Sequence, residues 1–304
     1  MKLATIDIGT HSVLLLIAQK NPDGKIKVLA DEATLTRIGE GMGSINNFLS
    51  SGMERTLAVL KKYKAICDQH RVEKILCVGT AAFRKAKNVA DFVIQVKKET
   101  GIEIEIISGE REAALTWKAA STDFGSDIMV VDIGGGSTEV ICPVSLRGGQ
   151  WPTKQSTSIP IGSVLLTEKY CHSDPVSDAD YQNICNVIEQ TLPSPQPSPT
   201  RGEGKRLVAT AGTATTLGAI KMKMKIYHHN EIHGSKLSLA ELKKIIADFK
   251  SKTIEERKKI PGLEPGRADV ILVGSLLLEK IAEHFGFQEI TVSDRGVRWG
   301  LMYE

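Results

Sequence analysis

The stretch TIDIGTHSVLLL occupies residues 5–16, and the stretch VVDIGGGSTEV occupies residues 130–140. In both, a short run of apolar and β-branched residues leads into Asp-Ile-Gly, which small or hydroxyl residues follow. Such a run predicts a buried strand, and the glycine after it predicts a tight turn. Because this strand-and-turn pattern occurs twice, the sequence predicts duplicated halves with one such loop in each.

The two loops have the composition of phosphate-binding turns. A glycine-rich turn presents backbone N–H groups to an anion, and glycine lets the backbone approach phosphate oxygens closely. Asp7 and Asp132 stand at the strand ends, where a carboxylate can bind or orient Mg²⁺. Two coincidental turns are the alternative interpretation, which the repetition disfavours. The candidate phosphate ligands in these loops are Gly9, Thr10, Ser12, Gly134, Gly135, Gly136, Ser137 and Thr138.

A third turn of this kind, VATAGTATTLGAI, occupies residues 208–220 and adds Gly212 and Thr213 as candidate phosphate ligands. The chain contains no Walker A pattern, so it is not a P-loop protein. We expect the two halves to face each other across a cleft, where each half would bind one part of an oligophosphate.

Strand patterns alternate with helical patterns along the chain, which predicts an α/β fold with mostly parallel strand pairing. A length of 304 residues suits two domains. We expect a first domain at residues 1–120, with a closing helix at 295–304 packed back on it, and a second domain at 121–294. The stretch LPSPQPSPTRGEGK at 192–205 has prolines that exclude a helix or a central strand, and it predicts an exposed, disordered insertion. A docking ligand in the polyproline II conformation is the alternative.

Composition narrows the class of protein. Apolar residues make up 41% of the chain and charged residues 25%, as in soluble globular proteins. The net charge of +3 gives no field that would favour DNA or RNA, and no apolar run reaches the roughly 18 residues that cross a bilayer. From the N-terminal pattern we expect no signal peptide. Five cysteines without a CxxC pattern indicate reduced thiols in a cytoplasmic protein, with a catalytic thiol or a zinc site as the alternative.

Six further stretches complete a series that resembles one family. They are VGTAAFRKAKN (78–88), IISGEREA (106–113), PIGSVLLTEKY (160–170), EIHGSKL (231–237), PGLEPGRADVILVGSLLLE (261–279) and VSDRGVRWGL (292–301). Together with the DIG loops and the GTATT turn, this order is similar to that of the exopolyphosphatase / guanosine pentaphosphate phosphatase (Ppx/GppA) family of the actin-like superfamily. The resemblance covers nearly the whole chain apart from the 192–205 insertion.

The resemblance implies an α/β fold of two duplicated ribonuclease H-like/actin-like domains with a cleft between them. It implies a phosphohydrolase that releases orthophosphate from the end of inorganic polyphosphate, converts pppGpp to ppGpp, or does both. It also implies Mg²⁺ as the cofactor, and it admits K⁺ as a second cation and a homodimer as the assembly.

The resemblance also assigns roles to residues. Glu112 occupies the place of the catalytic base, and a surface glutamate on a first helical turn is the alternative. Glu139 corresponds to a second carboxylate that positions metal or water, unless it is an exposed strand residue. Arg84 is expected to bind phosphate through its planar guanidinium group, and a solvent-exposed arginine without this role is the alternative. Arg267 resembles a phosphate-binding arginine of the second domain.

Two positions depart from the family pattern. Arg111 stands where an acidic residue usually precedes the catalytic glutamate, so it either lowers the pKa of Glu112 or points outward to solvent. His11 replaces an asparagine in the first loop, which would alter one phosphate contact or the pH dependence.

Two local clusters have less specific interpretations. His228, His229 and His233 have a spacing that suggests zinc, but we favour a loop near the mouth of the cleft. Alternating lysines at 221, 223 and 225 would share one face if they lay on a strand, and on any element they would form a local positive strip. A long polyphosphate would need such a strip beyond the catalytic centre, and a solvated face is the alternative.

Two other functions stay open at this stage. An actin-like small-molecule kinase would need a hydroxyl acceptor, and the IISGEREA segment argues against it. A sensor of polyphosphate or alarmone would bind the same ligands without releasing phosphate.

Overall fold

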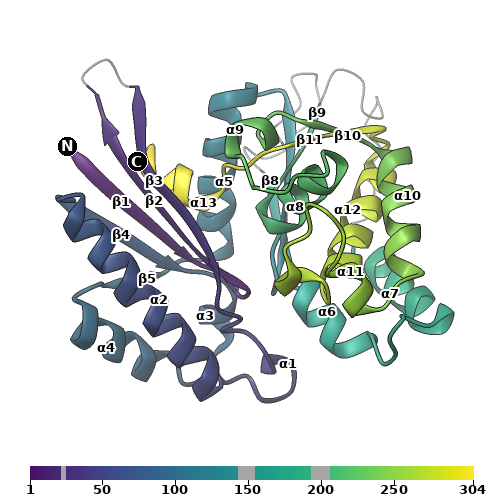
Figure 1. Cartoon of the computed structure of the whole chain (residues 1–304), viewed down its shortest axis with the longest axis horizontal. Helices are drawn as coiled ribbons and strands as arrows, with labels where there is room; N and C mark the ends of the chain where they lie inside the picture. Colours follow the sequence, from purple (N-terminus) through teal and green to yellow (C-terminus); the bar gives the residue numbers. More distant parts are fainter. Residues whose placement is uncertain (22–24, 143–154, 193–205) are drawn as a thin grey trace. The chain divides into compact units, whose positions relative to one another are not determined.

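The computed structural model describes residues 1–21, 25–142, 155–192 and 206–304. The chain divides into two compact units. Unit 1 comprises Met1–Ala119 and Val297–Glu304, so it contains both termini, and unit 2 comprises Ala120–Gly296 (Figure 1). The predicted insertion at 192–205 lies, from residue 193 onward, outside the described residues.

Unit 1 is built on a five-stranded mixed sheet of order β3-β2-β1-β4-β5. Strands β1, β2 and β3 form antiparallel hairpins, whereas β1, β4 and β5 run parallel. The parallel strands place the loops that follow them at one edge of the sheet. The strands are β1 (Lys2–Ile8), β2 (Ser12–Lys20), β3 (Ile26–Leu35), β4 (Lys74–Gly79) and β5 (Ile104–Ile106).

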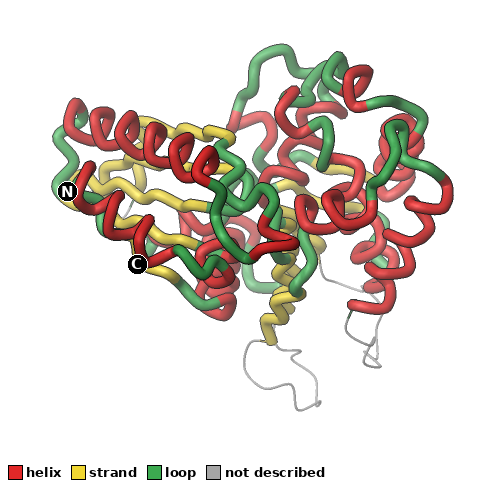
Figure 2. Tube along the Cα trace, turned by 90° about the horizontal axis from the view of Figure 1, so that it is seen from below, coloured by secondary structure: helices red, strands yellow, loops and turns green. Residues whose placement is uncertain are grey.

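Both faces of this sheet are covered by helices, because its strands carry apolar residues on alternating sides. Ile6 and Val13 pack in the core beneath the helices α2 (Ser50–Gln69) and α4 (Val89–Thr100). On the other face, Leu3 and Leu16 pack with residues of α5 (Gly109–Phe124) and α13 (Val297–Met302). Figure 2 shows these helices in red against the yellow strands. Two short helices, α1 (Met42–Ile45) and α3 (Ala81–Lys85), complete the unit.

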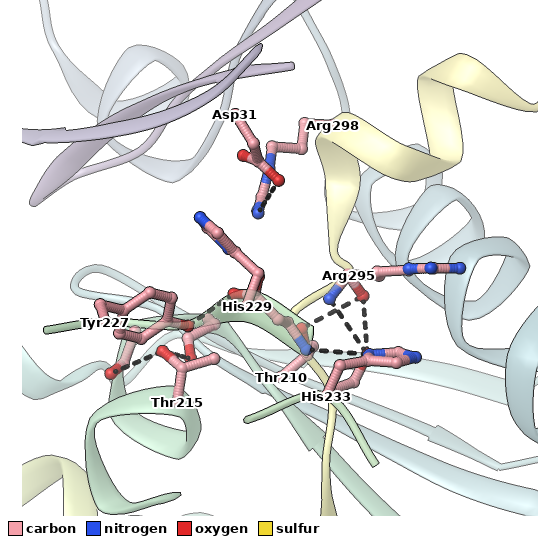
Figure 3. A network of polar contacts seen from close by, with 12 residues as sticks. Asp31, Thr210, Thr215, Tyr227, His229, His233, Arg295 and Arg298 are labelled. Atoms are coloured by element: carbon pink, nitrogen blue, oxygen red, sulfur yellow. Dashed lines mark hydrogen bonds and ion pairs between the residues drawn. The ribbon is translucent and has the colours of Figure 1, made fainter. Parts of the chain in front are cut away.

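Helix α13 is attached to unit 1 by a buried ion pair. Arg298 donates from Nε and Nη2 to the two carboxylate oxygens of Asp31 on β3, at 3.0 and 3.2 Å (Figure 3). The Oγ1 of Thr5 on β1 also donates to the carbonyl of Arg298 at 2.8 Å. The last helix of the chain therefore packs against the first strand.

Unit 2 repeats the strand order of unit 1. Its six-stranded sheet has the order β10-β11-β9-β6-β7-β8, so β8-β7-β6-β9-β11 corresponds to β3-β2-β1-β4-β5, with the same parallel and antiparallel pairs. Strand β10 is added at one edge. The strands are β6 (Ile128–Ile133), β7 (Thr138–Cys142), β8 (Gln155–Ile159), β9 (Arg206–Thr210), β10 (Lys236–Ser238) and β11 (Glu289–Val292).

One large apolar core joins the sheet of unit 2 to its helices. The N-terminus of α10 (Leu239–Lys250) carries a capping box, in which the side chains of Ser238 and Glu241 each accept a hydrogen bond from the other residue's backbone amide. The longer helices are α6 (Ser163–Tyr170), α7 (Asp178–Thr191), α8 (Ala211–Lys221), α10 (Leu239–Lys250) and α12 (Ile271–Phe285), and the short ones are α9 (His229–Ile232), α11 (Ile254–Arg257) and the 3₁₀ helix η1 (Pro265–Arg267).

One expectation from the sequence was wrong. Strand pairing is not mostly parallel, because the short connections β1–β2, β2–β3 and β6–β7 permit only antiparallel pairs, and β7–β8 and β10–β11 are antiparallel as well. The lysines at 221, 223 and 225 do not lie on a strand, because α8 ends at Lys221 and the backbone turns there. The ammonium group of Lys221 instead binds Glu241 at 2.9 Å.

The described cysteines are free thiols. Cys67, Cys77 and Cys185 are buried, and burial raises the pKa of the Cys67 thiol to about 11. In the described part of the chain, no helix combines the length and the apolar character that a bilayer span requires.

Candidate active site

The two DIG loops have the same backbone geometry. In unit 1, the amide of Gly9 donates to the carbonyl of Ser12 at 2.9 Å, and in unit 2 the amide of Gly134 donates to the carbonyl of Ser137 at 3.0 Å. Each loop connects two antiparallel strands, β1 to β2 and β6 to β7. The repeated sequence pattern therefore corresponds to a repeated hairpin turn, placed at the same point of two equivalent sheets.

The second loop is held in place by the start of α6. The amides of Ser163 and Val164 donate to the carbonyls of Gly134 and Gly135, both at 3.0 Å. A Cβ atom on Gly162 would lie 2.5 Å from the carbonyl of Gly135, so a larger residue would displace the loop. This packing fixes the backbone of the GGG turn independently of any ligand.

In unit 1, Arg84 and Glu112 come together at the carboxyl edge of the sheet. Arg84 lies on α3, which follows β4, and Glu112 lies in the first turn of α5, which follows β5. The Nη1 atom of Arg84 is 2.6 Å from Oε2 of Glu112 and 3.0 Å from the carbonyl of Ile107. The candidate phosphate ligand and the candidate base are therefore direct partners, which the sequence did not indicate.

The surroundings of Glu112 suit a proton acceptor. Only 7% of Glu112 is exposed, and burial raises the pKa of its carboxyl group, while the charge of Arg84 opposes that rise. Arg111 does not contact this carboxylate. Its guanidinium binds Glu105 and, at 3.2 Å, Glu304, so it points outward.

In unit 2, Glu139 is buried beside the GGG loop. Its Oε1 accepts hydrogen bonds from Ser137 Oγ and Ser158 Oγ, both at 2.8 Å. Glu139 is 1% exposed, and it pairs in register with Asp132, which is 8% exposed. Two carboxylates, one from each strand of the hairpin, thus stand next to the loop.

The GTATT turn lies at the same edge, because β9 runs parallel to β6. Arg267 of η1 packs directly on this turn, since a Cβ atom on Gly212 would lie 2.1 Å from Nη1 of Arg267. Thr213 is buried in the first turn of α8. The structure thus brings Gly212, Thr213 and Arg267 together, although 54 residues separate Thr213 from Arg267 in the sequence.

The segment after β11 also lies at this edge of the sheet, although none of its residues was predicted as a site residue. Thr210 Oγ1 donates to the carbonyl of Arg295 at 3.3 Å, and a Cβ atom on Gly296 would lie 3.9 Å from Oδ2 of Asp132. The SDRG residues of VSDRGVRWGL could have indicated this position. They form a polar turn after β11, the third parallel strand of unit 2, and this turn must lie at the same edge of the sheet as the turns after β6 and β9.

Two histidines of the 228–233 cluster, His229 and His233, contact acidic residues of unit 2. His229 Nδ1 binds the carboxylate of Asp294, whereas His233 Nε2 lies 3.5 Å from Asp123. Asp123 also binds Arg295 at 2.5 Å. Burial lowers the pKa of His233, and the nearby Arg295 lowers it further. Figure 3 shows His229, His233 and Arg295 on this segment of unit 2.

Comparison with known proteins identifies the family. The model of the Ppx/GppA phosphatase family matches residues 16–304. Exopolyphosphatase 2 of Mycobacterium tuberculosis is 30% identical, over 99% of this chain and 97% of that protein. A bifunctional 3-dehydroquinate synthase/phosphatase of Fusobacterium nucleatum is 33% identical over 99% of this chain, which spans 46% of that protein. A guanosine-5'-triphosphate,3'-diphosphate pyrophosphatase of Vibrio cholerae is 27% identical over 99% of this chain and 58% of that protein.

A solved structure identifies the same family. The crystal structure of the Aquifex aeolicus Ppx/GppA family member superposes with a TM-score of 0.79 at 33% identity, and the match covers 100% of this chain and 96% of that one. The predicted fold class, two duplicated α/β domains of the actin-like type, is confirmed. By sequence and by structure, the chain belongs to the Ppx/GppA phosphatase family.

Proposed function

We propose that this protein is an exopolyphosphatase-type phosphohydrolase, which releases orthophosphate from the end of inorganic polyphosphate, from the 5′-end of pppGpp, or from both. The observation that carries the proposal is the contact of the buried Glu112 with the partly buried Arg84 at the carboxyl edge of unit 1. The names of the relatives, exopolyphosphatase and guanosine-5'-triphosphate,3'-diphosphate pyrophosphatase, support the same reaction class.

In the proposed reaction, Glu112 accepts a proton from water as the water oxygen forms a bond to the terminal phosphorus. The anhydride P–O bond breaks, and the shortened chain leaves with the electron pair of that bond. The products are orthophosphate and a chain one phosphate shorter. Arg84 neutralises charge on the terminal phosphate, and the amides of the two DIG loops and the GTATT turn bind the other phosphates.

Mg²⁺ is the cofactor that the donor set fits. Asp132 is a buried carboxylate that pairs in register with Glu139, and Asp7 has the equivalent place in unit 1. Carboxylates combined with phosphate and water oxygens are the ligands that Mg²⁺ prefers. When bound, the ion would neutralise phosphate charge, and Glu139 would orient the water or ligands beside it.

The test is phosphate release from tripolyphosphate, long-chain polyphosphate and pppGpp in ¹⁸O-labelled water with Mg²⁺. The proposal predicts one labelled oxygen in each orthophosphate released. Tight binding of these ligands without release would favour a sensor instead. Transfer of the phosphoryl group to a hydroxyl acceptor would favour an actin-like kinase.

A further inference from the structure

The carboxyl edge of unit 2 carries one feature that phosphate binding leaves unexplained. Asp294, directly after β11, binds two aromatic side chains with one carboxylate. Tyr227 donates from its hydroxyl to Oδ1 at 2.8 Å, and His229 Nδ1 contacts Oδ2. The side chain of Asp294 is only 11% exposed. Figure 3 shows Tyr227 and His229 on this segment of unit 2.

The two rings form a fixed pair. Their centroids are 4.9 Å apart, and their planes meet at 80°. The segment is anchored behind them, because Ile232 is fully buried and the amide of Asp294 donates to Nδ1 of His233 at 3.3 Å. Because the hydroxyl of Tyr227 is hydrogen-bonded and the residues behind it are packed, its ring loses little conformational freedom when a ligand stacks on it.

The pair is nevertheless open to solvent, and apolar side chains accompany it. Tyr227 is 41% exposed, and its neighbour Ile226 is 71% exposed, more than any other large apolar side chain in the described part of the chain. Lys223 and Lys225, which precede these residues in the chain, are also exposed. Exposed aromatic and aliphatic side chains together with cations are typical of a nucleotide-binding surface.

The position of this surface connects it to the phosphate loops. Asp294 precedes Arg295 and Gly296, and these two residues lie beside Thr210 and Asp132 as described above. A linear polyphosphate offers nothing apolar for such a surface to bind. A nucleoside attached to the phosphate chain does offer it, since every base has a face that stacks on an aromatic ring.

We propose that Tyr227 and Ile226 form a binding surface for the base of a nucleoside 5′-polyphosphate, with Lys223 and Lys225 placed for further phosphates on its ribose. This inference rests on the proposed function, because it names the substrate class of the same site. It makes Tyr227 a specificity-determining residue and a nucleoside polyphosphate the preferred substrate.

The test compares kcat/KM for pppGpp with kcat/KM for tripolyphosphate in Tyr227→Ala, Ile226→Ser and Tyr227→Phe. We expect the ratio of the two values to fall about 10-fold or more in Tyr227→Ala, the size of effect that loss of one stacking ring produces. Ile226→Ser should lower the ratio in the same direction, and Tyr227→Phe, which keeps the ring, should lower it least.

Ile94→Ser is the matched control, because Ile94 is 66% exposed on α4 of unit 1 and should leave the ratio as in the wild type. A ratio within about twofold of wild type in both Tyr227→Ala and Ile226→Ser would overturn the inference. If the wild type hydrolyses neither substrate, the proposed function fails, and calorimetric binding of pppGpp and tripolyphosphate to the same variants decides on the base surface by itself.

Discussion

Arg84 Nη1 and Glu112 Oε2 lie 2.6 Å apart in unit 1, although α3 and α5 place them on separate helices. A carboxylate held by a guanidinium is a weaker base than one that is simply buried. In Glu112 the two influences oppose each other, because burial raises the pKa and Arg84 restrains the rise. In the proposed mechanism, Arg84 therefore adjusts the basicity of Glu112 besides binding phosphate.

This pairing predicts a pH effect of defined sign. Glu112 must be ionised to accept a proton, so activity falls as the pH drops through its pKa. Removing the Arg84 charge leaves burial unopposed and raises that pKa. The acidic limb of the pH profile of kcat/KM should therefore move to higher pH in Arg84→Met, with KM raised as well. Lys85→Met, which removes a charge from the same helix, should leave the limb in place. A limb that moves to lower pH in Arg84→Met would contradict this role.

The two loop aspartates predict a requirement for a divalent cation. EDTA should abolish phosphate release, and Mg²⁺ should restore it. Asp132→Asn should raise the Mg²⁺ concentration needed for half-maximal activity by about 10-fold or more, because a coordinating or orienting carboxylate is lost. Asp127→Asn, at an exposed position just before β6, serves as the control. An unaltered Mg²⁺ dependence of Asp132→Asn would remove this residue from the metal site.

The close approach of Gly212 to Arg267 predicts a steric effect. In Gly212→Ala the added methyl group would meet the guanidinium of Arg267 and push it from its place. We expect kcat/KM to fall by about 10-fold to 100-fold, as small misplacements of a binding group can produce. Gly218→Ala in the same helix meets neighbours at 3.4 Å or more and should stay near wild type. Equal activities of the two variants would show that Arg267 does not contribute.

The bidentate pair of Asp31 and Arg298 predicts a large effect on stability. Their side chains are 11% and 6% exposed, so Asp31→Asn leaves a buried guanidinium without its counter-charge. Urea denaturation should show a loss of about 3–5 kcal/mol in the free energy of unfolding. The exposed i,i+4 pair of Lys64 and Asp68 is the comparison, and Asp68→Asn should cost at most about 0.5 kcal/mol. Similar losses in both variants would contradict this account of how α13 is held.

The sequence predicted the repeated elements well, because their signals are local. The paired DIG patterns and the apolar strands that precede them each depend on residues close together in the chain. Pairing direction was predicted less well, since the hairpins β1–β2–β3 have the same apolar character as parallel strands. Short elements such as α3 and β10 were missed because too few residues form them to show a period.

The contacts of the candidate site depend on tertiary placement. Arg84 and Glu112 are 28 residues apart in the sequence, and Gly212 meets Arg267 only because η1 folds over the start of α8. Whether Arg111 lies beside Glu112 or points outward depends in the same way on tertiary placement, because its partner Glu304 is distant in the sequence. Resemblance to a family suggested the residues of the site, and only the fold gave their partners.

The most direct test is the turnover number for tripolyphosphate of Glu112→Gln beside that of Glu110→Gln. Both variants remove one carboxylate from the first turn of α5, but Glu110 is exposed and Glu112 is buried against Arg84. We predict that kcat falls by about 100-fold to 10,000-fold in Glu112→Gln, the usual loss of a general base, and stays near wild type in Glu110→Gln. Full activity of Glu112→Gln would contradict the assignment of Glu112 as the group that activates water.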